Sequence, residues 1–298
     1  MGARSSVCDP QVSPPVSLVL GTNSYQGDPD AMRRQSRALD SFQSLPDVIA
    51  IDVQWADTGP KRPGIRTVAA LRRDSTTVTG RAGRVKPIVS DVLDALAAIA
   101  EREGCRYFAY MNSDIIVSPA AVALVAAGDR QAYAFSRMDY DRTGRDTDLI
   151  LTGCDAFAFD VAWWRANRHR FRPYILGEPC WDNVYASLLM CHGNGLLVNR
   201  DAAIRHETHA TAWGAGAFSE YNGFLATLDA RYFTLWATYH ARLTEARARA
   251  ASETEERSIA ASVFEWRRSP ALALKQAARD VRAHVQYRRK RARWPAVK

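Results

Sequence analysis

Short apolar runs alternate with amphipathic stretches along the first 130 residues. Runs rich in β-branched and aromatic residues predict strands over residues 16–20, 48–53, 65–71, 106–111, 131–135 and 149–159. Helices are predicted over residues 28–42, 87–100 and 117–127. Asp28 and Pro29 are typical of a helix start. The alternation predicts an α/β fold with a parallel sheet that helices cover on both faces.

The second half of the chain becomes progressively more helical. A helix over residues 181–190 and a strand over 195–204 are predicted, and the chain is helical from Tyr221 onward. Residues 241–261 are rich in Ala, Arg and Glu, which indicates an exposed helix. We therefore expect a catalytic α/β domain over residues 1–215 and a helical C-terminal region over 216–298.

Composition and charge narrow the class of protein. No apolar run approaches the roughly 18 residues of a membrane span, and the polar start lacks the apolar core of an export signal. The five cysteines include no C-x-x-C pair, which favours reduced thiols and a soluble, cytoplasmic protein.

The net charge of +8 is concentrated at the C-terminus. Residues 281–298 hold seven Lys and Arg and no acid, so the rest of the chain carries about +1. This distribution does not favour a domain that binds a specific nucleic acid. The tail is either a solvated end or a peripheral contact with the inner face of a membrane.

The most informative segment for chemistry is Tyr107–Pro119. An apolar strand there runs into Asn112-Ser113-Asp114. Ligands of open α/β sheets bind at the carboxyl ends of strands, where a carboxylate can hold Mn²⁺ or Mg²⁺. A helix or turn cap is the alternative role for Asp114.

This segment resembles the D-x-D region of glycosyltransferases with the Rossmann-like GT-A fold, which implies a mixed, mainly parallel sheet flanked by helices. Three later features keep the family's order: Gly153-Cys154-Asp155-Ala156-Phe157, the acidic segment 177–183, and the pair His206 and His209. The resemblance covers residues 16–215. It implies a metal-assisted transfer of sugar from a nucleotide-sugar donor to a hydroxyl of a glycan or lipid-linked acceptor, as in polysaccharide biosynthesis.

The resemblance also implies roles for individual residues. Asp114 would be the main metal ligand, His209 the favoured further ligand and His206 the other; both histidines could instead lie in a surface loop. Asn112 stands where the family usually has its first Asp, which removes one carboxylate but leaves a carbonyl oxygen that can ligate.

Two acids are candidates for activating the acceptor hydroxyl. Asp182 opens the predicted helix and is the expected general base for an inverting reaction, with a helix cap as its alternative role. Glu178 lies four residues earlier and is the second candidate, or a surface acid.

Further residues are expected to hold the donor. Arg81, Arg84 and Lys86 precede a helix in a Gly-containing loop and would contact the diphosphate, or form a solvated basic loop. Thr22 and Asn23 end the first strand and are candidate nucleotide contacts. Weaker candidates for contacts with donor or acceptor are Arg137, Asp139 and Asp141.

Other classes of protein remain open from the sequence. A sugar nucleotidyltransferase would carry a Gly-rich basic loop after its first strand, which GTNSYQGDPD matches poorly. A metal-dependent hydrolase could use Asp114, His206 and His209. A basic module that binds membranes or nucleic acid through its tail would leave these residues unexplained.

Overall fold

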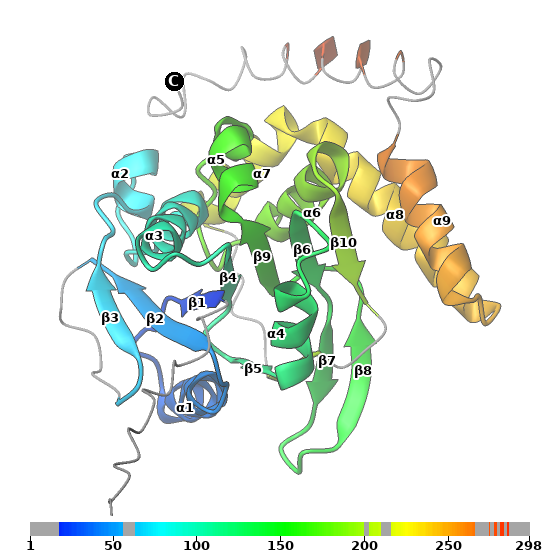
Figure 1. Ribbon diagram of the computed structural model, residues 1–298. Helices are drawn as coiled ribbons and strands as arrows, with labels where there is room; N and C mark the ends of the chain where they lie inside the picture. The colour runs from blue at the N-terminus through cyan, green and yellow to red at the C-terminus, as the bar shows by residue number, and fades with distance from the viewer. Residues whose placement is uncertain are drawn as a thin grey trace, which may run out of the picture.

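A mixed seven-stranded sheet forms the centre of the molecule, in the order β10-β6-β9-β4-β1-β2-β3 (Figure 1). The computed structural model describes residues 18–55, 63–199, 203–209 and 216–265, with six single residues between 274 and 285. The strands of this sheet are β1 (Leu18–Thr22), β2 (Val48–Gln54), β3 (Arg66–Ala69), β4 (Tyr107–Met111), β6 (Ala132–Phe135), β9 (Ala156–Asp160) and β10 (Gly195–Val198). Four neighbouring pairs are parallel, and β9 runs antiparallel to both β4 and β6. The predicted α/β fold with a mainly parallel sheet is thus confirmed.

A second sheet of four short strands lies beside the first, in the order β5-β11-β7-β8. Its strands are β5 (Ile115–Val117), β11 (Ile204–Glu207), β7 (Arg137–Tyr140) and β8 (Asp146–Ile150). The sequence pattern merged these strands with their neighbours. The strand predicted over 149–159 is the end of β8, a loop and β9, and the strand predicted over 195–204 divides between β10 and β11.

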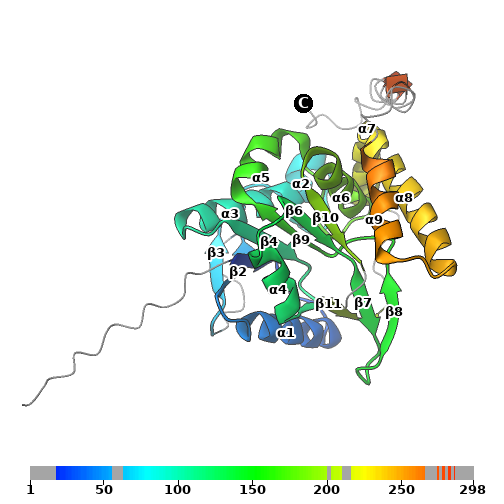
Figure 2. The same ribbon diagram turned by 45° about the vertical axis from the view of Figure 1, so that its right-hand side comes forward.

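Helices cover both faces of the large sheet (Figure 2). They are α1 (Pro29–Gln43), α2 (Ser75–Thr79), α3 (Val89–Arg102), α4 (Pro119–Ala126), α5 (Val161–Asn167), α6 (Trp181–His192), α7 (Ala217–Leu228), α8 (Ala230–Ala248) and α9 (Glu253–Phe264). The predicted start of α1 is confirmed, because the Asp28 side chain accepts a hydrogen bond from the Ala31 amide at 2.7 Å. The helix predicted over 117–127 begins at Pro119, two residues after the predicted start, because β5 ends at Val117.

Alternation along β1 divides the apolar core between the two faces. Val19 belongs to a cluster that includes residues of α3, α5 and α6, whereas Leu18 and Leu20 belong to one that includes residues of α1 and α4. The sheet is therefore buried on both sides, as expected for parallel strands.

The C-terminal helices join the first of these clusters. Trp236 and Leu243 of α8 and Phe264 of α9 are buried in the same core as Val19. The single exposed helix predicted over 241–261 is wrong, because α8 ends at Ala248 and α9 begins at Glu253, and both bury apolar side chains. Weak hydrophobicity over the whole segment concealed the few apolar positions that pack.

In the part of the chain that the structure describes, no helix is both long and apolar enough to span a bilayer. The basic segment 281–298 lies outside the described residues except for Val281, Arg282 and Val285, whose side chains are exposed.

Candidate functional site

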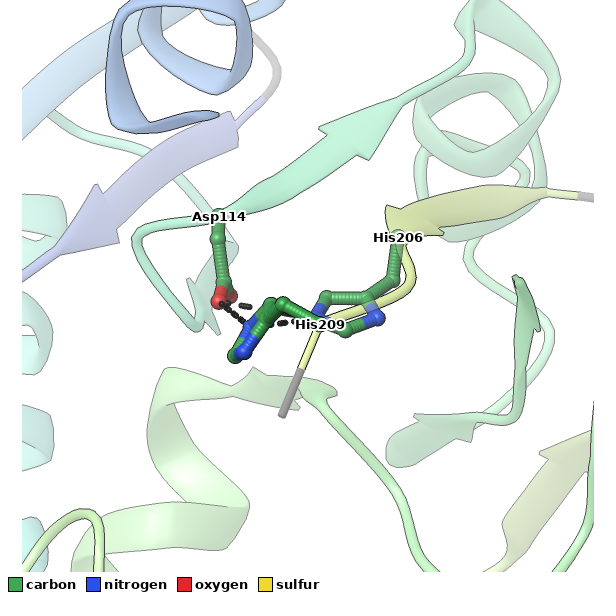
Figure 3. Close-up of side chains that lie close together, drawn as sticks. All are labelled: Asp114, His206 and His209. Atoms are coloured by element: carbon green, nitrogen blue, oxygen red, sulfur yellow. Dashed lines mark hydrogen bonds and ion pairs between the residues drawn. The ribbon is translucent and has the colours of Figure 1, made fainter. Parts of the chain in front are cut away.

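The register of the small sheet brings together one aspartate and two histidines. Asp114 directly precedes β5, whose antiparallel pairing with β11 places Ile115 opposite His206. His209 follows β11 by two residues, and its ring turns back toward Asp114 (Figure 3). Residues almost 100 positions apart therefore meet through strand pairing.

The three side chains form a compact group of possible metal ligands. His209 Nε2 lies 3.2 Å from Asp114 Oδ2, and His206 Nε2 lies 3.5 Å from the same oxygen and 3.1 Å from His209 Nε2. One ligand atom from each residue lies within 4.8 Å of the others. Burial raises the pKa of the Asp114 carboxyl. Its contacts with His206 and His209 lower the pKa by a larger amount, so the net shift is downward. An ionised carboxylate with two imidazoles is a donor set suited to a divalent cation.

Asp139 contacts the Nδ1 atom of His206, the ring nitrogen that points away from Asp114. The parallel pairing of β7 with β11 places Asp139 beside His206, and Asp139 Oδ1 lies 3.1 Å from His206 Nδ1. A proton on Nδ1 would leave the Nε2 lone pair directed at the cluster, which is the arrangement that metal-ligating histidines adopt.

Arg137 connects this cluster to a second group of polar residues. Its guanidinium lies 2.8 Å from Asp139 Oδ1 and 2.6 Å from Asp155 Oδ2. Asp155 also accepts a hydrogen bond from Asn112 Nδ2 at 2.7 Å, and Asn112 Oδ1 accepts one from Tyr110. The Asn112 side chain thus lies in a protein network, and its carbonyl oxygen already has one donor.

Asp182 lies in the first turn of α6, next to the loop that precedes β9. Asp182 Oδ2 accepts a hydrogen bond from the Cys154 amide at 3.3 Å, and a Cβ added at Gly153 would lie 2.3 Å from the same oxygen. The N-cap position of α6 belongs to Cys180, which has a positive φ of 82°. Burial, and then the charge of Asp155, raise the pKa of Asp182 to about 7. A carboxyl with this pKa is half ionised near neutral pH and suits proton transfer.

Glu178 and Lys86 contact each other. Lys86 Nζ lies 2.6 Å from Glu178 Oε1, and the Ser219 hydroxyl donates a hydrogen bond to the same carboxylate. Glu178 is buried. The pair fixes the loop before α3 to the segment before α6.

The end of β1 forms a buried polar network with the end of β2. Asn23 Nδ2 donates to the Val53 carbonyl at 2.6 Å, and the Ser24 hydroxyl and amide both donate to Asp52. Asp52 is 2% exposed and no ion pair to it is present among the described residues. Thr22 is fully buried, and its hydroxyl has no hydrogen-bond partner among those residues. The sequence analysis did not select Asp52, because it lies inside an apolar strand.

The remaining predicted residues lie in loops. Arg84 donates to the Gln26 carbonyl at 3.2 Å and stacks on Tyr25 at 4.9 Å, so its loop reaches the end of β1. The Arg81 amide donates to the Thr79 hydroxyl. Asp141 accepts hydrogen bonds from the amides of Thr143 and Arg145, which gives it a role in the turn between β7 and β8.

No protein-family model matches the chain, and no curated protein matches it. Solved structures do show similarity. The alignment with the structure of TarS 1–349 from S. aureus covers 90% of this chain and 88% of the TarS chain, with 10% identity and a TM-score of 0.44. The galactosyltransferase LgtC in complex with donor and acceptor sugar analogues covers 69% and 95%, with 13% identity and a TM-score of 0.36.

A third similar structure is the mannosyltransferase PcManGT from Pyrobaculum calidifontis in complex with GDP-Man and Mn²⁺. It covers 94% of this chain and 76% of its own, with 12% identity and a TM-score of 0.37. LgtC and PcManGT are, by name, sugar transferases, the class that the sequence motifs resemble. At these identities and TM-scores we base the function on the residues of this chain.

Proposed function

We propose that the protein is a glycosyltransferase that moves a sugar from a nucleoside-diphosphate sugar to a hydroxyl acceptor. The observation that supports this most is the convergence of Asp114, His206 and His209 beside a sheet edge. The partly buried carboxyl of Asp182 adds a group suited to proton transfer. Asp155 is connected to His206 through Arg137 and Asp139, and its charge contributes to the raised pKa of Asp182. Such a transfer needs an anion-stabilising group and a base, and the site offers both.

The donor would lie across the carboxyl ends of β1 and β4. Asn23, Ser24 and Asp52 form a hydrogen-bonded polar network at the ends of β1 and β2, and the nucleoside would lie against it. Asp114 lies just beyond β4, which pairs with β1 in parallel, so the diphosphate would follow the nucleoside toward it. A divalent cation on Asp114, His206 and His209 would stabilise the charge that develops on the leaving diphosphate.

We propose Mn²⁺ as the cation rather than Mg²⁺. Mg²⁺ strongly prefers oxygen ligands, and two of the three side chains here offer imidazole nitrogen. The same donor set also suits Fe²⁺ and Zn²⁺, so metal content measured after purification from defined medium identifies the natural ion.

Asp182 is the proposed general base for the acceptor hydroxyl. The Cys154 amide donates a hydrogen bond to its carboxylate, and Gly153 leaves room for the same oxygen. Its raised pKa lets it accept a proton at neutral pH. Glu178 is the second candidate, but its ion pair with Lys86 makes it a positioning group for the acceptor side. The acceptor would be a glycan or a lipid-linked sugar, and the tail would bring the enzyme to an anionic membrane surface.

The test is turnover of a panel of UDP-, GDP- and dTDP-sugars with Mn²⁺, with simple sugars as acceptors. Release of nucleoside diphosphate together with a glycosylated product detected by mass spectrometry is the expected result. Hydrolysis of phosphate esters or amides, without turnover of any sugar nucleotide, would instead identify a metal-dependent hydrolase.

A further inference from the structure

Arg34 is a partly buried cation without a protein partner in the described structure. Its Nε–H group is buried and donates no hydrogen bond to the described residues, and none of them forms an ion pair with Arg34. Its neighbours on α1 differ in this respect. Arg33 and Arg37 both pair with Glu207, with Arg33 Nη1 at 2.7 Å and Arg37 Nη1 at 3.1 Å from Glu207 Oε2. A buried N–H group without an acceptor costs free energy unless a ligand supplies one.

The position of α1 brings Arg34 toward the metal cluster. The helix packs on β5, where the Val117 amide donates to the Ser41 hydroxyl at 3.1 Å, and on β11 through Glu207. Asp114 directly precedes β5, and His206 lies within β11. Arg34 lies about 100° around the helix from Arg33, between the side that faces Glu207 and the buried side of Ala31 and Ala38.

The charge of Arg34 affects the pKa of two other groups, Tyr25 and Glu207. Burial and then the charge of Asp114 raise the pKa of the Tyr25 hydroxyl, and the charges of Arg34 and Arg84 oppose this shift. Hydrogen bonding from Arg33 lowers the pKa of Glu207, and the charge of Arg34 adds to that effect. Arg34 is therefore close to Tyr25, which also senses Asp114, and to Glu207, which adjoins His206.

The other cations near the site are already engaged. Lys86 pairs with Glu178, Arg137 pairs with Asp139 and Asp155, and Arg84 donates to the Gln26 carbonyl. Each would have to break an existing contact to bind a ligand. Arg34 would not, since it has no contact of this kind with the described residues.

We infer that Arg34 binds the diphosphate of the donor, together with the cation held by Asp114, His206 and His209. A guanidinium presents several N–H donors in a plane and matches the oxygens of a phosphate. The inference rests on the proposed function only where it concerns the nucleoside of the donor. Binding of inorganic pyrophosphate tests the contact between Arg34 and the anion by itself. Arg34 thus takes the role that the sequence analysis assigned to Arg81, Arg84 and Lys86.

The experiment measures binding of UDP, GDP and inorganic pyrophosphate to the full-length protein by calorimetry in the presence of Mn²⁺. Uridine and guanosine serve as ligands without phosphate. Arg34→Met is compared with Arg66→Met. Arg66 lies on β3 and forms an exposed ion pair with Glu103, so the control removes the same charge away from the site. Circular dichroism and thermal melting confirm that each variant is folded. If Arg34→Met does not fold, Arg34→Gln takes its place.

We expect Arg34→Met to weaken the binding of pyrophosphate and of the nucleoside diphosphate that the protein prefers by about 10- to 100-fold. Binding of nucleosides and of Mn²⁺ alone should not weaken, and Arg34→Lys should recover part of the loss. Equal affinities in Arg34→Met and Arg66→Met, or an equal loss for nucleosides, would overturn the inference. Arg34-dependent binding of pyrophosphate without any sugar transfer would support the inference and contradict the proposed function.

Discussion

At the scale of single residues, the site depends on side chains that hold other side chains. His206 and Asp114 meet at 3.5 Å, but the orientation of His206 is set by Asp139 on the neighbouring strand, and Asp139 is itself held by Arg137. Loss of the hydrogen-bond partner of a metal ligand typically lowers metal affinity about 10- to 100-fold.

Asp139→Asn tests this role. The variant keeps the size of the side chain but removes the charge that favours a proton on His206 Nδ1, so we expect Mn²⁺ affinity to fall about 10- to 100-fold. Calorimetric titration with Mn²⁺ measures the change without any substrate. A merely structural role would lower the melting temperature and leave Mn²⁺ affinity as in the wild type.

Asp182 provides a prediction about pH. Since its pKa is raised to about 7 and a base must be ionised, kcat should rise from pH 6 to pH 8 and level off above. Asp182→Asn should lower kcat by about 10²-fold or more with little change in donor affinity, and should abolish the rise. A variant with normal kcat would show that the carboxylate only supports the start of α6.

The raised pKa of Asp182, which makes kcat rise with pH, makes the stability of the fold fall with pH. The folded protein holds the Asp182 proton more tightly than the unfolded chain between the ordinary pKa of 3.8 and about 7, so this residue lowers stability as pH rises through that window. Asp182→Asn should therefore be more stable than wild type at pH 8, on the order of 2 kcal/mol, and similar at pH 4. Denaturant unfolding at both values measures the difference.

At the scale of elements, the longer helices and the strands of the large sheet were predictable, and most strands of the small sheet were not. β1, β2, β4, α1, α3 and α6 have enough apolar residues to show their period, and they appear within a few residues of the predicted ranges. β5, β7 and β11 have three or four residues each, too few for a periodic signal, and they create the register that joins His206 to Asp114 and Asp139. Residue types identified Asp114, His206 and His209 as candidates, but the contacts of Asp139, Arg137 and Asp52 depend on pairing between distant segments.

The loop between β8 and β9 gives a prediction at this scale. Because a Cβ at Gly153 would lie 2.3 Å from Asp182 Oδ2, Gly153→Ala must displace the carboxylate or the loop. We expect a fall in kcat of about 10-fold or more, with Mn²⁺ affinity unchanged, since the metal cluster lies on other strands. Gly223→Ala in α7, where an added Cβ has nothing within 4 Å, controls for the general effect of the substitution. Equal activity in both variants would contradict the placement of Asp182 at the reacting centre.

At the scale of the whole molecule, the C-terminal helices support the site as well as the core. Trp236 of α8 donates a hydrogen bond to the Thr152 carbonyl at 3.1 Å, next to the glycine that contacts Asp182, and its ring is buried with Tyr239. The helical character of this region could be predicted from composition, but its shared core could not. Only the folded chain shows which few apolar residues of α8 and α9 face α6.

The basic tail gives a prediction that concerns the chain as a whole. Residues 281–298 hold seven positive charges, each worth about 1 kcal/mol near an anionic surface. Full-length protein should co-sediment with anionic vesicles at low salt and be released at high salt, whereas a chain ending at Asp280 should stay in solution. Equal sedimentation of the two chains, or binding indifferent to salt, would exclude the tail as the membrane contact.

The central claim is that Asp114, His206 and His209 hold a cation through which the donor binds. Calorimetric titration of wild-type protein and Asp114→Asn with UDP- and GDP-sugars, with and without Mn²⁺, tests it most directly. We expect wild-type protein to bind one of these donors at least about 10-fold more tightly with Mn²⁺, and the folded Asp114→Asn variant to lose that difference. Donor affinity independent of Mn²⁺ in wild-type protein, or an unchanged Mn²⁺ effect in the variant, would contradict the account.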